Sequence, residues 1–139
     1  MFIPEVLKYR KKFRRLFKVR EKGISKAQSY LFNNRWGIKA MESFLMSPEQ
    51  LETCRRLIKK ILGRKAIFRV PIFFNVSLTK KPNEVRMGKG KGNIYKWIFP
   101  IRKGRILFEF KTLRKMTAKR LVVNLKFKLP IPIRLVYKK

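Results

Sequence analysis

Apolar side chains recur at intervals of three and four residues in the middle of the chain, and this spacing predicts a helix between Ser47 and Gly63. Ser47 takes the N-cap position, Pro48 the first helical position, and Gln50 the position that completes a capping box. Gly63 follows the last turn, where glycine readily adopts the backbone of a helix terminus. The apolar face consists of Leu51, Cys54, Leu57, Ile58, Ile61 and Leu62.

Beyond this helix the chain becomes rich in Ile, Val and Phe, which favours strands. Residues 65–78, "KAIFRVPIFFNVSL", predict one or two strands broken at Pro71, because proline cannot donate to a central ladder. Side chains alternate between two faces in "NIYKWIF", residues 93–99, and the turn "PIRKG" leads back through "RILFEF", residues 105–110. We expect the last two segments to pair with each other as a hairpin.

A second helix is predicted from about Thr112 to Phe127, with Thr112 as its N-cap. Its apolar positions are Leu113, Met116, Leu121, Val122 and Leu125. Pro130 ends this helix, and "PIPIRLVY", residues 130–137, predicts a final strand whose prolines mark a sheet edge or the start of the strand.

The order of helix, strands, long loop, hairpin, helix and strand favours an α+β fold, because strands and helices do not alternate regularly. A chain of 139 residues fits one domain. We expect this domain to cover residues 36–139, with two main helices packed on a mixed or antiparallel sheet and a loop protruding at about residues 78–93. Residues 1–35 form a predicted basic N-terminal extension.

The charge of the chain indicates a polyanionic partner. Thirty-eight Lys and Arg against seven acidic residues give a net charge of +31. Such self-repulsion destabilises a compact chain, so we expect an anionic macromolecule to offset it. The basic residues run from one end to the other and 45% of residues are hydrophobic, which indicates a folded basic domain and not a disordered arm.

The residue types that are missing exclude most catalytic chemistry. The chain has no His and no Asp, and its seven acids are Glu residues scattered singly along the sequence. It therefore lacks an imidazole base, a paired acid and base close in sequence, and a motif for a catalytic metal. The single cysteine, Cys54, lies on the apolar face of the first predicted helix and is expected to be a small buried hydrophobe.

The first twenty residues, "MFIPEVLKYRKKFRRLFKVR", interleave aromatic residues and cations. They have no continuous apolar segment typical of a signal peptide, and no stretch of the chain approaches the roughly 18 apolar residues of a membrane span. The pattern resembles a mitochondrial transit peptide, but Ser is absent before Ser25, so we expect mature protein. A cationic amphipathic segment can bind anionic lipid as well as RNA, and a membrane-surface protein is therefore the alternative.

The segment "RMGKGKGN", residues 86–93, allows three interpretations. It is not a Walker A loop, because Gly88, Gly90 and Gly92 have the wrong spacing and Asn93 stands where the hydroxyl would meet magnesium. A dinucleotide fingerprint fails as well, since the segment leads into a strand. A solvated loop and a flexible cationic loop that follows folded RNA both stay open, and the overall charge favours the second.

A longer stretch around this loop, "KPNEVRMGKGKGN" at residues 81–93, closely resembles the signature of the sixteenth protein of the bacterial-type large ribosomal subunit. Further segments match this family in order: Pro4 followed by "KYRKKFR", "WGIKA" at 36–40, "SPEQLETCRR" at 47–56, "KGRILFEF" at 103–110 and "KLPI" at 128–131. The chain departs from the family at "FFNVSLTKKP" and "FKTL", and residues 17–35 match poorly.

The resemblance implies an α/β-hammerhead type of α+β fold, and a structural role with no enzymatic activity and no cofactor. It also implies large-subunit ribosomal RNA, aminoacyl-site tRNA and neighbouring ribosomal proteins as partners, with no membrane and no small-molecule substrate. The protein would bind ribosomal RNA near the elbow of the aminoacyl-site tRNA, and its glycine-rich loop would reach toward the peptidyl transferase centre. The residues expected to contact RNA are Lys8, Arg10, Lys11, Lys12, Arg14, Arg15, Arg35, Arg55, Arg56, Lys80, Lys81, Arg86, Met87, Gly88, Lys89, Gly90, Lys91, Gly92 and Asn93.

Composition also suggests a compartment. The chain contains twelve Phe, only four Ala and abundant Lys, as an AT-rich coding sequence would produce. We therefore expect a ribosomal protein encoded in an organelle, with the mitochondrion favoured over a plastid or a bacterium.

Overall fold

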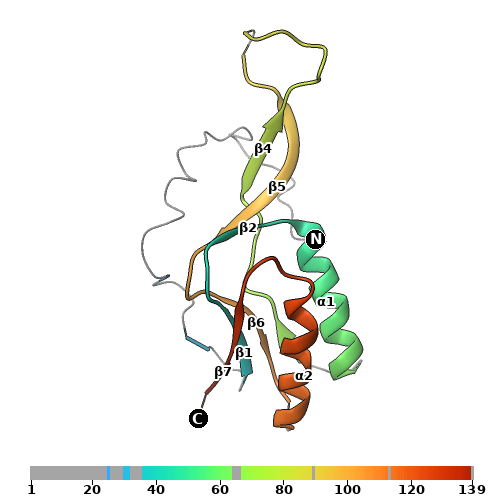
Figure 1. Ribbon diagram of the computed structural model, residues 1–139, viewed down its shortest axis with the longest axis vertical. Helices are drawn as coiled ribbons and strands as arrows, with labels where there is room; N and C mark the ends of the chain where they lie inside the picture. Colours follow the sequence, from blue (N-terminus) through green and yellow to red (C-terminus); the bar gives the residue numbers. More distant parts are fainter. Residues whose placement is uncertain are drawn as a thin grey trace.

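The computed structural model describes residues 25, 30–31, 36–63, 67–88, 90–112 and 114–138. Within these residues the chain forms an α+β domain, as predicted, with two helices and two antiparallel sheets (Figure 1). One sheet has the strand order β3-β6-β1-β7 and the other has the order β2-β5-β4. In sequence order the elements are β1 (Trp36–Ala40), β2 (Phe44–Met46), α1 (Pro48–Leu62), β3 (Phe68–Arg69), β4 (Val76–Lys80), β5 (Asn93–Ile101), β6 (Ile106–Phe110), α2 (Lys115–Lys126) and β7 (Ile133–Tyr137).

Helix α1 confirms the first predicted helix. The residues that begin and end it act through hydrogen bonds within one turn of each helix end. The Gln50 backbone N–H donates to Ser47 Oγ at 3.4 Å, and the Ser47 backbone N–H donates to Gln50 Oε1 at 3.0 Å, which closes the capping box. Gly63 ends the helix with a φ of 89°, and its N–H donates to the Lys59 carbonyl at 3.0 Å. The predicted apolar face points into the core: Leu51, Cys54 and Ile58 are fully buried, and Leu57, Ile61 and Leu62 pack against them.

Helix α2 begins later than predicted. Arg114 occupies its N-cap without a side-chain hydrogen bond, so the assignment of Thr112 as N-cap was wrong. The Thr112 carbonyl instead accepts a hydrogen bond from Trp36 Nε1 at 3.0 Å, which holds this residue in the connection between β6 and α2. Met116, assigned to the apolar face, is 74% exposed, whereas Ala118, Leu121, Val122 and Leu125 are buried. Leu113 lies outside the described residues.

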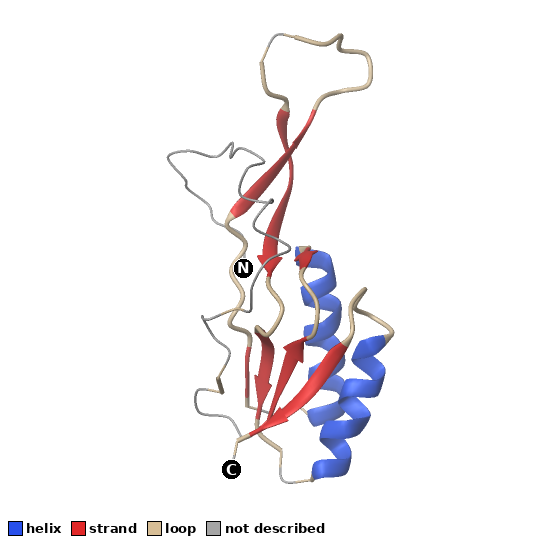
Figure 2. Cartoon of the chain, turned by 60° about the vertical axis from the view of Figure 1, so that its left-hand side comes forward, coloured by secondary structure: helices blue, strands red, loops and turns tan. Residues whose placement is uncertain are grey.

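The four-stranded sheet supplies most of the core. Strand β6 lies between β3 and β1, and all five of its residues are buried. Strand β1 pairs with β6 on one side and β7 on the other, and both helices lie along one face of this sheet (Figure 2). Strand β7 confirms the predicted final strand and lies at the sheet edge, one of the two positions that its prolines allowed. The largest fully buried side chains include Phe74, Phe108 and Phe110.

The predicted hairpin of residues 93–99 with residues 105–110 was wrong. Strand β5 pairs with β4 and β2, whereas β6 pairs with β1 and β3, so the two segments belong to different sheets. A turn does connect them, with the Arg105 N–H donating to the Arg102 carbonyl at 3.2 Å. Because both edges of the buried strand β6 are taken by β1 and β3, β5 has no place beside it. Pro71 separates β3 from β4, in agreement with the predicted break.

Candidate nucleic-acid interface

The most prominent feature of the surface is a two-stranded projection that we call the finger, made of β4, the loop 81–92 and β5. It extends away from the helices and the four-stranded sheet, and its loop forms the far end of the molecule (Figure 1). Strands β4 and β5 pair in antiparallel register from Val76 opposite Ile98 to Lys80 opposite Asn93. The predicted glycine- and lysine-rich loop therefore caps a long hairpin and does not simply connect two elements of the body.

Two loop glycines serve backbone conformation. Gly88 has a φ of 99° and Gly90 a φ of 80°, and an added Cβ would meet no atom within 4 Å at either position. These positive φ values disfavour L-residues with side chains, as the glycine spacing suggested. Both residues are exposed, so the backbone here is accessible to another molecule.

Gly92 serves a different purpose. A Cβ at this position would lie 2.6 Å from the Lys80 carbonyl oxygen and 2.9 Å from the Lys81 nitrogen. The two arms of the hairpin approach each other closely where the loop begins, and only a glycine fits between them. We call this place, formed by Lys80, Lys81 and Gly92, the neck of the loop.

The side chains around the loop divide into those held by the loop and those directed outward. Lys81 Nζ donates to the Gly88 carbonyl across the loop, and the Val85 N–H donates to the Pro82 carbonyl at 3.3 Å. Arg86 is exposed, and Met87 is 99% exposed, which is unusual for a large apolar side chain. A guanidinium and a thioether at the tip of a projection are suited to contact RNA phosphates and bases.

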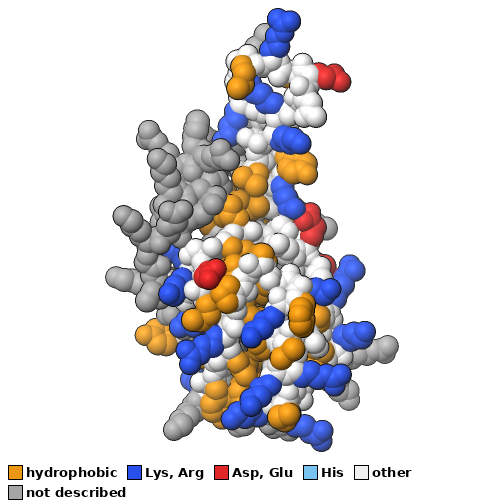
Figure 3. All heavy atoms as spheres, viewed as in Figure 1, with side chains coloured by type: hydrophobic (Ala, Val, Ile, Leu, Met, Phe, Trp, Pro, Cys, Tyr) orange, Lys and Arg blue, Asp and Glu red, His pale blue; other side chains and the backbone are white. Residues whose placement is uncertain are grey.

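Cations and an aromatic ring also adjoin each other below the loop. Lys80 Nζ lies 5.7 Å from the centroid of the Tyr95 ring, and that ring is 70% exposed. The finger therefore presents positive charge and aromatic surface side by side, a combination that binds single-stranded or looped RNA. Figure 3 shows Lys and Arg side chains on the loop and over the body on the same view of the molecule.

The finger is fixed to the body at its base. Val76 and Ile98 form a small apolar cluster with Leu45 and Leu78, while strand β2 pairs with the lower end of β5. Lys96 Nζ donates to Glu49 Oε2 at 2.5 Å and thereby joins β5 to the first turn of α1. Hydrogen bonds from Lys96 and then Ser47 lower the pKa of the Glu49 carboxyl below its usual value.

The two arginines predicted to contact RNA from the first helix, Arg55 and Arg56, differ in how accessible they are to an external anion. Arg55 Nε and Nη2 each donate to Glu52 at 2.7 Å, whereas Arg56 makes a single bond to the same carboxylate at 3.1 Å. These contacts, led by the hydrogen bond from Arg55, lower the pKa of Glu52 to about 2. The side chain of Arg56 is 78% exposed and that of Arg55 30%. Arg56 is thus better placed than Arg55 to meet an external anion.

Eight of the predicted RNA-contacting residues lie outside the residues that the structure describes. They are Lys8, Arg10, Lys11, Lys12, Arg14, Arg15, Arg35 and Lys89. Lys91 and Asn93 are described and exposed, one in the loop and one at the start of β5.

Three further cations escaped prediction and line one hollow of the sheet surface: Lys39, Lys103 and Arg134. They are 31 to 95 positions apart; Lys39 and Arg134 each stand between apolar residues, and Lys103 lies between Arg102 and Gly104. Strand pairing is needed to bring them together, so no local sequence motif predicts them.

Chemical groups for other kinds of site are scarce in the described ranges. Burial raises the pKa of the Cys54 thiol to about 12, so the cysteine is a buried hydrophobe, as predicted. Within residues 36–138, apart from the undescribed positions there, no three His, Cys, Asp or Glu residues form a group able to hold a metal ion. No helix in the same part of the chain has the length and apolar character needed to cross a membrane.

Comparison with known proteins places these features in a family. A family model described as ribosomal protein L16p/L10e matches residues 4–136. A protein from Coprothermobacter proteolyticus is 38% identical over 137 residues, which cover 98% of each chain, and one from Carsonella ruddii is 37% identical over 134 residues, 96% of each. A third, from Petrotoga mobilis, is 35% identical over 136 residues, 98% of this chain and 94% of the relative. Each of the three is named large ribosomal subunit protein uL16.

Proposed function

This chain belongs to the ribosomal protein L16p/L10e family, and from that premise we propose where on the large ribosomal subunit its surfaces act. Membership makes the protein a structural constituent of the large subunit that binds ribosomal RNA and neighbouring proteins, and not an enzyme. The net charge of +31 agrees with such a partner, because RNA phosphates offset the self-repulsion of the chain.

The finger reaches RNA near the elbow of the aminoacyl-site tRNA and the peptidyl transferase centre, and there it supports translation and subunit assembly. The observation that carries this proposal is the exposed tip, where Arg86 and Met87 directly precede the positive-φ glycines at the end of a hairpin fixed to the body. Gly88 and Gly90 let the backbone approach RNA closely, while Arg86 can form paired hydrogen bonds to a phosphate. Lys80, Lys89, Lys91 and Asn93 add contacts around the same tip.

A paired substitution tests the role of the tip. Changing Arg86→Gln together with Met87→Ala removes the exposed guanidinium and thioether, and we expect slower translation and altered chemical reactivity of peptidyl-transferase RNA in isolated large subunits. The matched control is Arg120→Gln with Met116→Ala, an exposed pair on α2 that is distant from the finger. Equal effects of the two double variants, or unchanged RNA reactivity with the tip variant, would contradict the proposal.

The basic N-terminal extension and the two arginines of α1 hold the protein on ribosomal RNA helices. Arg10, Lys11 and Lys12 belong to this group with Lys8, Arg14, Arg15, Arg35, Arg55 and Arg56. Phosphate contacts release counterions, so the affinity for RNA should fall steeply with salt, by about 0.7 to 0.9 log units per contact for each log unit of salt. A flat salt response of the full chain would exclude this electrostatic mechanism.

The ribosome in question is mitochondrial. Twelve Phe, four Ala and abundant Lys support an AT-rich organellar gene, although the three relatives named above are bacterial. Immunoblotting of gradient fractions from purified mitochondria tests this proposal. The protein should sediment with the mitochondrial large subunit, and its sedimentation with plastid or bacterial ribosomes alone would contradict the assignment.

A further inference from the structure

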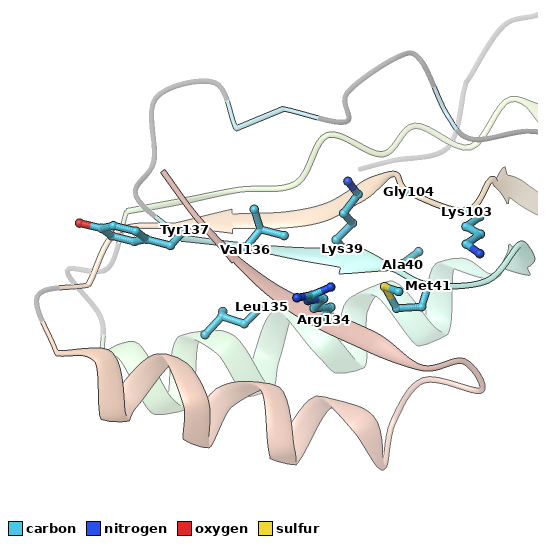
Figure 4. Close-up of a pocket in the computed structure, with 9 residues that line it drawn as sticks. All are labelled: Lys39, Ala40, Met41, Lys103, Gly104, Arg134, Leu135, Val136 and Tyr137. Carbon is cyan, nitrogen blue, oxygen red and sulfur yellow. The ribbon is translucent and has the colours of Figure 1, made fainter. Parts of the chain in front are cut away.

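The hollow on the four-stranded sheet lies on the face turned away from the helices, where β1, β7 and the turn between β5 and β6 meet. It has a volume of about 420 Å³, and Lys103 and Arg134 in its lining are exposed. Figure 4 shows Lys39 and Val136 rising from this face, while Leu135 points to the other side, toward the helices. The nine residues that line it are Lys39, Ala40, Met41, Lys103, Gly104, Arg134, Leu135, Val136 and Tyr137.

Two of its cations are forced together by strand register. Lys39 of β1 lies directly opposite Arg134 of β7 in the antiparallel ladder. Side chains at directly opposite positions share one face, with Cβ atoms about 5 Å apart, and like charges in such pairs destabilise the sheet. A cross-strand pair of cations is therefore an arrangement that a bound anion would relieve.

The third cation is fixed beside this pair by backbone hydrogen bonds. The Gly104 N–H donates to the Ala40 carbonyl at 2.8 Å, and the Ala40 N–H donates to the Arg105 carbonyl at 2.9 Å, which ties the turn to the end of β1. Gly104 has a φ of 90°, a conformation that favours glycine and lets the turn close against the strand. The Lys103 N–H also donates to Ser43 Oγ at 3.0 Å, so the position of Lys103 relative to Lys39 is set by the fold.

No described residue that lines the hollow is acidic. The acidic residue of the four-stranded sheet, Glu109, lies opposite Arg69 of β3 and Gly37 of β1; it is buried and is not part of the lining, and Glu42 is exposed outside the lining. The lining of the hollow contains three cations and no carboxylate among its described residues, around a space large enough for a nucleotide-sized group. An Arg fork and two Lys ammonium groups are the donors that RNA phosphates select.

We propose that this hollow is a second RNA-binding site, separate from the finger, in which Lys39, Lys103 and Arg134 bind phosphates of the ribosomal RNA backbone. The proposal rests on the proposed ribosomal function, because it takes its polyanion from the large subunit. The finger and the hollow lie at different parts of the molecule, so two RNA contacts would fix the orientation of the protein where one would only anchor it.

Matched charge removal tests the site. The hollow variant carries Lys39→Gln, Lys103→Gln and Arg134→Gln, and the control carries Lys119→Gln, Arg120→Gln and Lys126→Gln on the exposed face of α2; each loses two Lys and one Arg. The affinity of the full chain for a transcript of large-subunit ribosomal RNA is measured across a salt series. We expect the slope of log affinity against log salt to become shallower by about 2 to 3 in the hollow variant and by less than about 1 in the control.

The outcomes separate this inference from the function it rests on. If the hollow variant keeps the wild-type slope, or both variants lose the same amount, the hollow is not a site, while RNA binding by the chain stands. If the wild-type chain does not bind the transcript, both proposals fail. Inorganic phosphate is added to the same assay as a competitor, and we expect it to displace RNA only at high concentration. Displacement of RNA at a low phosphate concentration would indicate a site for free phosphate instead.

Two further measurements do not depend on charge removal. A photoreactive residue at Val136, inside the hollow, should crosslink to ribosomal RNA in assembled subunits, whereas one at Val123 on α2 should give at most a small fraction of that yield. A crosslink from position 136 to protein alone would overturn the inference. Without RNA, Arg134→Gln should raise the Tm of the full chain by about 1 to 4 °C because the like-charge pair is removed. A lower Tm would show that the arginine serves the fold instead.

Discussion

The finger and the body of this protein are held in shape by different forces. In the body, apolar burial dominates: Phe74, Phe108 and Phe110 are fully buried in one hydrophobic core. At the end of the finger the large apolar side chain of Met87 is almost wholly exposed, and the shape depends on positive-φ glycines, strand pairing and a few hydrogen bonds. The body is therefore sensitive to the volume of its side chains, and the finger to backbone geometry and charge.

The largest expected effect comes from the core. Phe108→Ala removes a fully buried ring from the central strand β6 and should destabilise the chain by roughly 3 to 5 kcal/mol through lost burial and a cavity. Chemical denaturation of the full chain measures this change. Met87→Ala deletes a side chain that is almost fully exposed, and its free energy of unfolding should stay within about 0.5 kcal/mol of the wild type. Similar losses for both variants would mean that the finger and the body are not distinguished by burial.

A smaller effect should distinguish glycines within the finger. Gly92→Ala places a Cβ against the Lys80 carbonyl at the neck, and displacement of the two arms should reduce stability by about 1 to 3 kcal/mol. Gly90→Ala meets no neighbouring atom, so its effect should be limited to the strain of a positive φ, about 1 kcal/mol at most after the loop relaxes.

Thermal unfolding gives the stability of both glycine variants, and a translation assay gives their function. We expect both substitutions to slow translation, because each changes the backbone of the tip, while only Gly92→Ala lowers the Tm clearly. The reverse order of Tm values would show that backbone conformation matters more than the close approach at the neck.

The smallest effect is electrostatic and lies on the surface of α1. The Glu52 carboxyl has a folded pKa of about 2, below its ordinary 4.5, so its contribution to stability is complete above pH 4.5 and disappears as the pH falls toward 2. The side chains of Arg55 and Glu52 are 30% and 35% exposed, so solvent screens the pair and its contribution should stay below about 1 kcal/mol. The difference in Tm between wild type and Glu52→Gln should therefore shrink steadily as the pH falls from 4.5 through 2. Glu84→Gln, in the exposed loop, is the control, and a difference that keeps its full size at pH 2 would contradict the assignment.

Local signals explain which parts of the fold could be predicted. Helix α1 was predicted to its ends because Ser47, Gln50 and Gly63 act within one turn of the positions they terminate. The strand pairing of β5 and β6 was not, because it depends on which distant strands fill the edges of a buried strand. Strand β1 was missed although its inward positions alternate, since it is short and Gly37 weakens the pattern; a Cβ there would lie 2.3 Å from the Leu31 side chain.

The candidate site likewise has one part that consecutive residues predict, the loop, and one part that they do not, the hollow. The loop could be recognised from consecutive residues, and the structure adds that Gly92 differs in its role from Gly88 and Gly90. The hollow could not be recognised, because Lys39 and Arg134 are joined only by the register of β1 against β7. A site made by pairing of remote strands has no signature in a single sequence unless the pairing is known.

Strand β5 is one continuous element whose lower residues pair with β2 and whose upper residues pair with β4. Nine residues in extended conformation span roughly 30 Å, so a small tilt of the strand at its end in the body displaces its loop end by a larger distance. A tilt of about 5° moves the loop end of the strand by roughly 2.5 Å, a displacement large enough to break a hydrogen bond made there. Substitutions at the base of the finger, including those at the Lys96–Glu49 contact, can thus change the position of the tip without altering any residue in it.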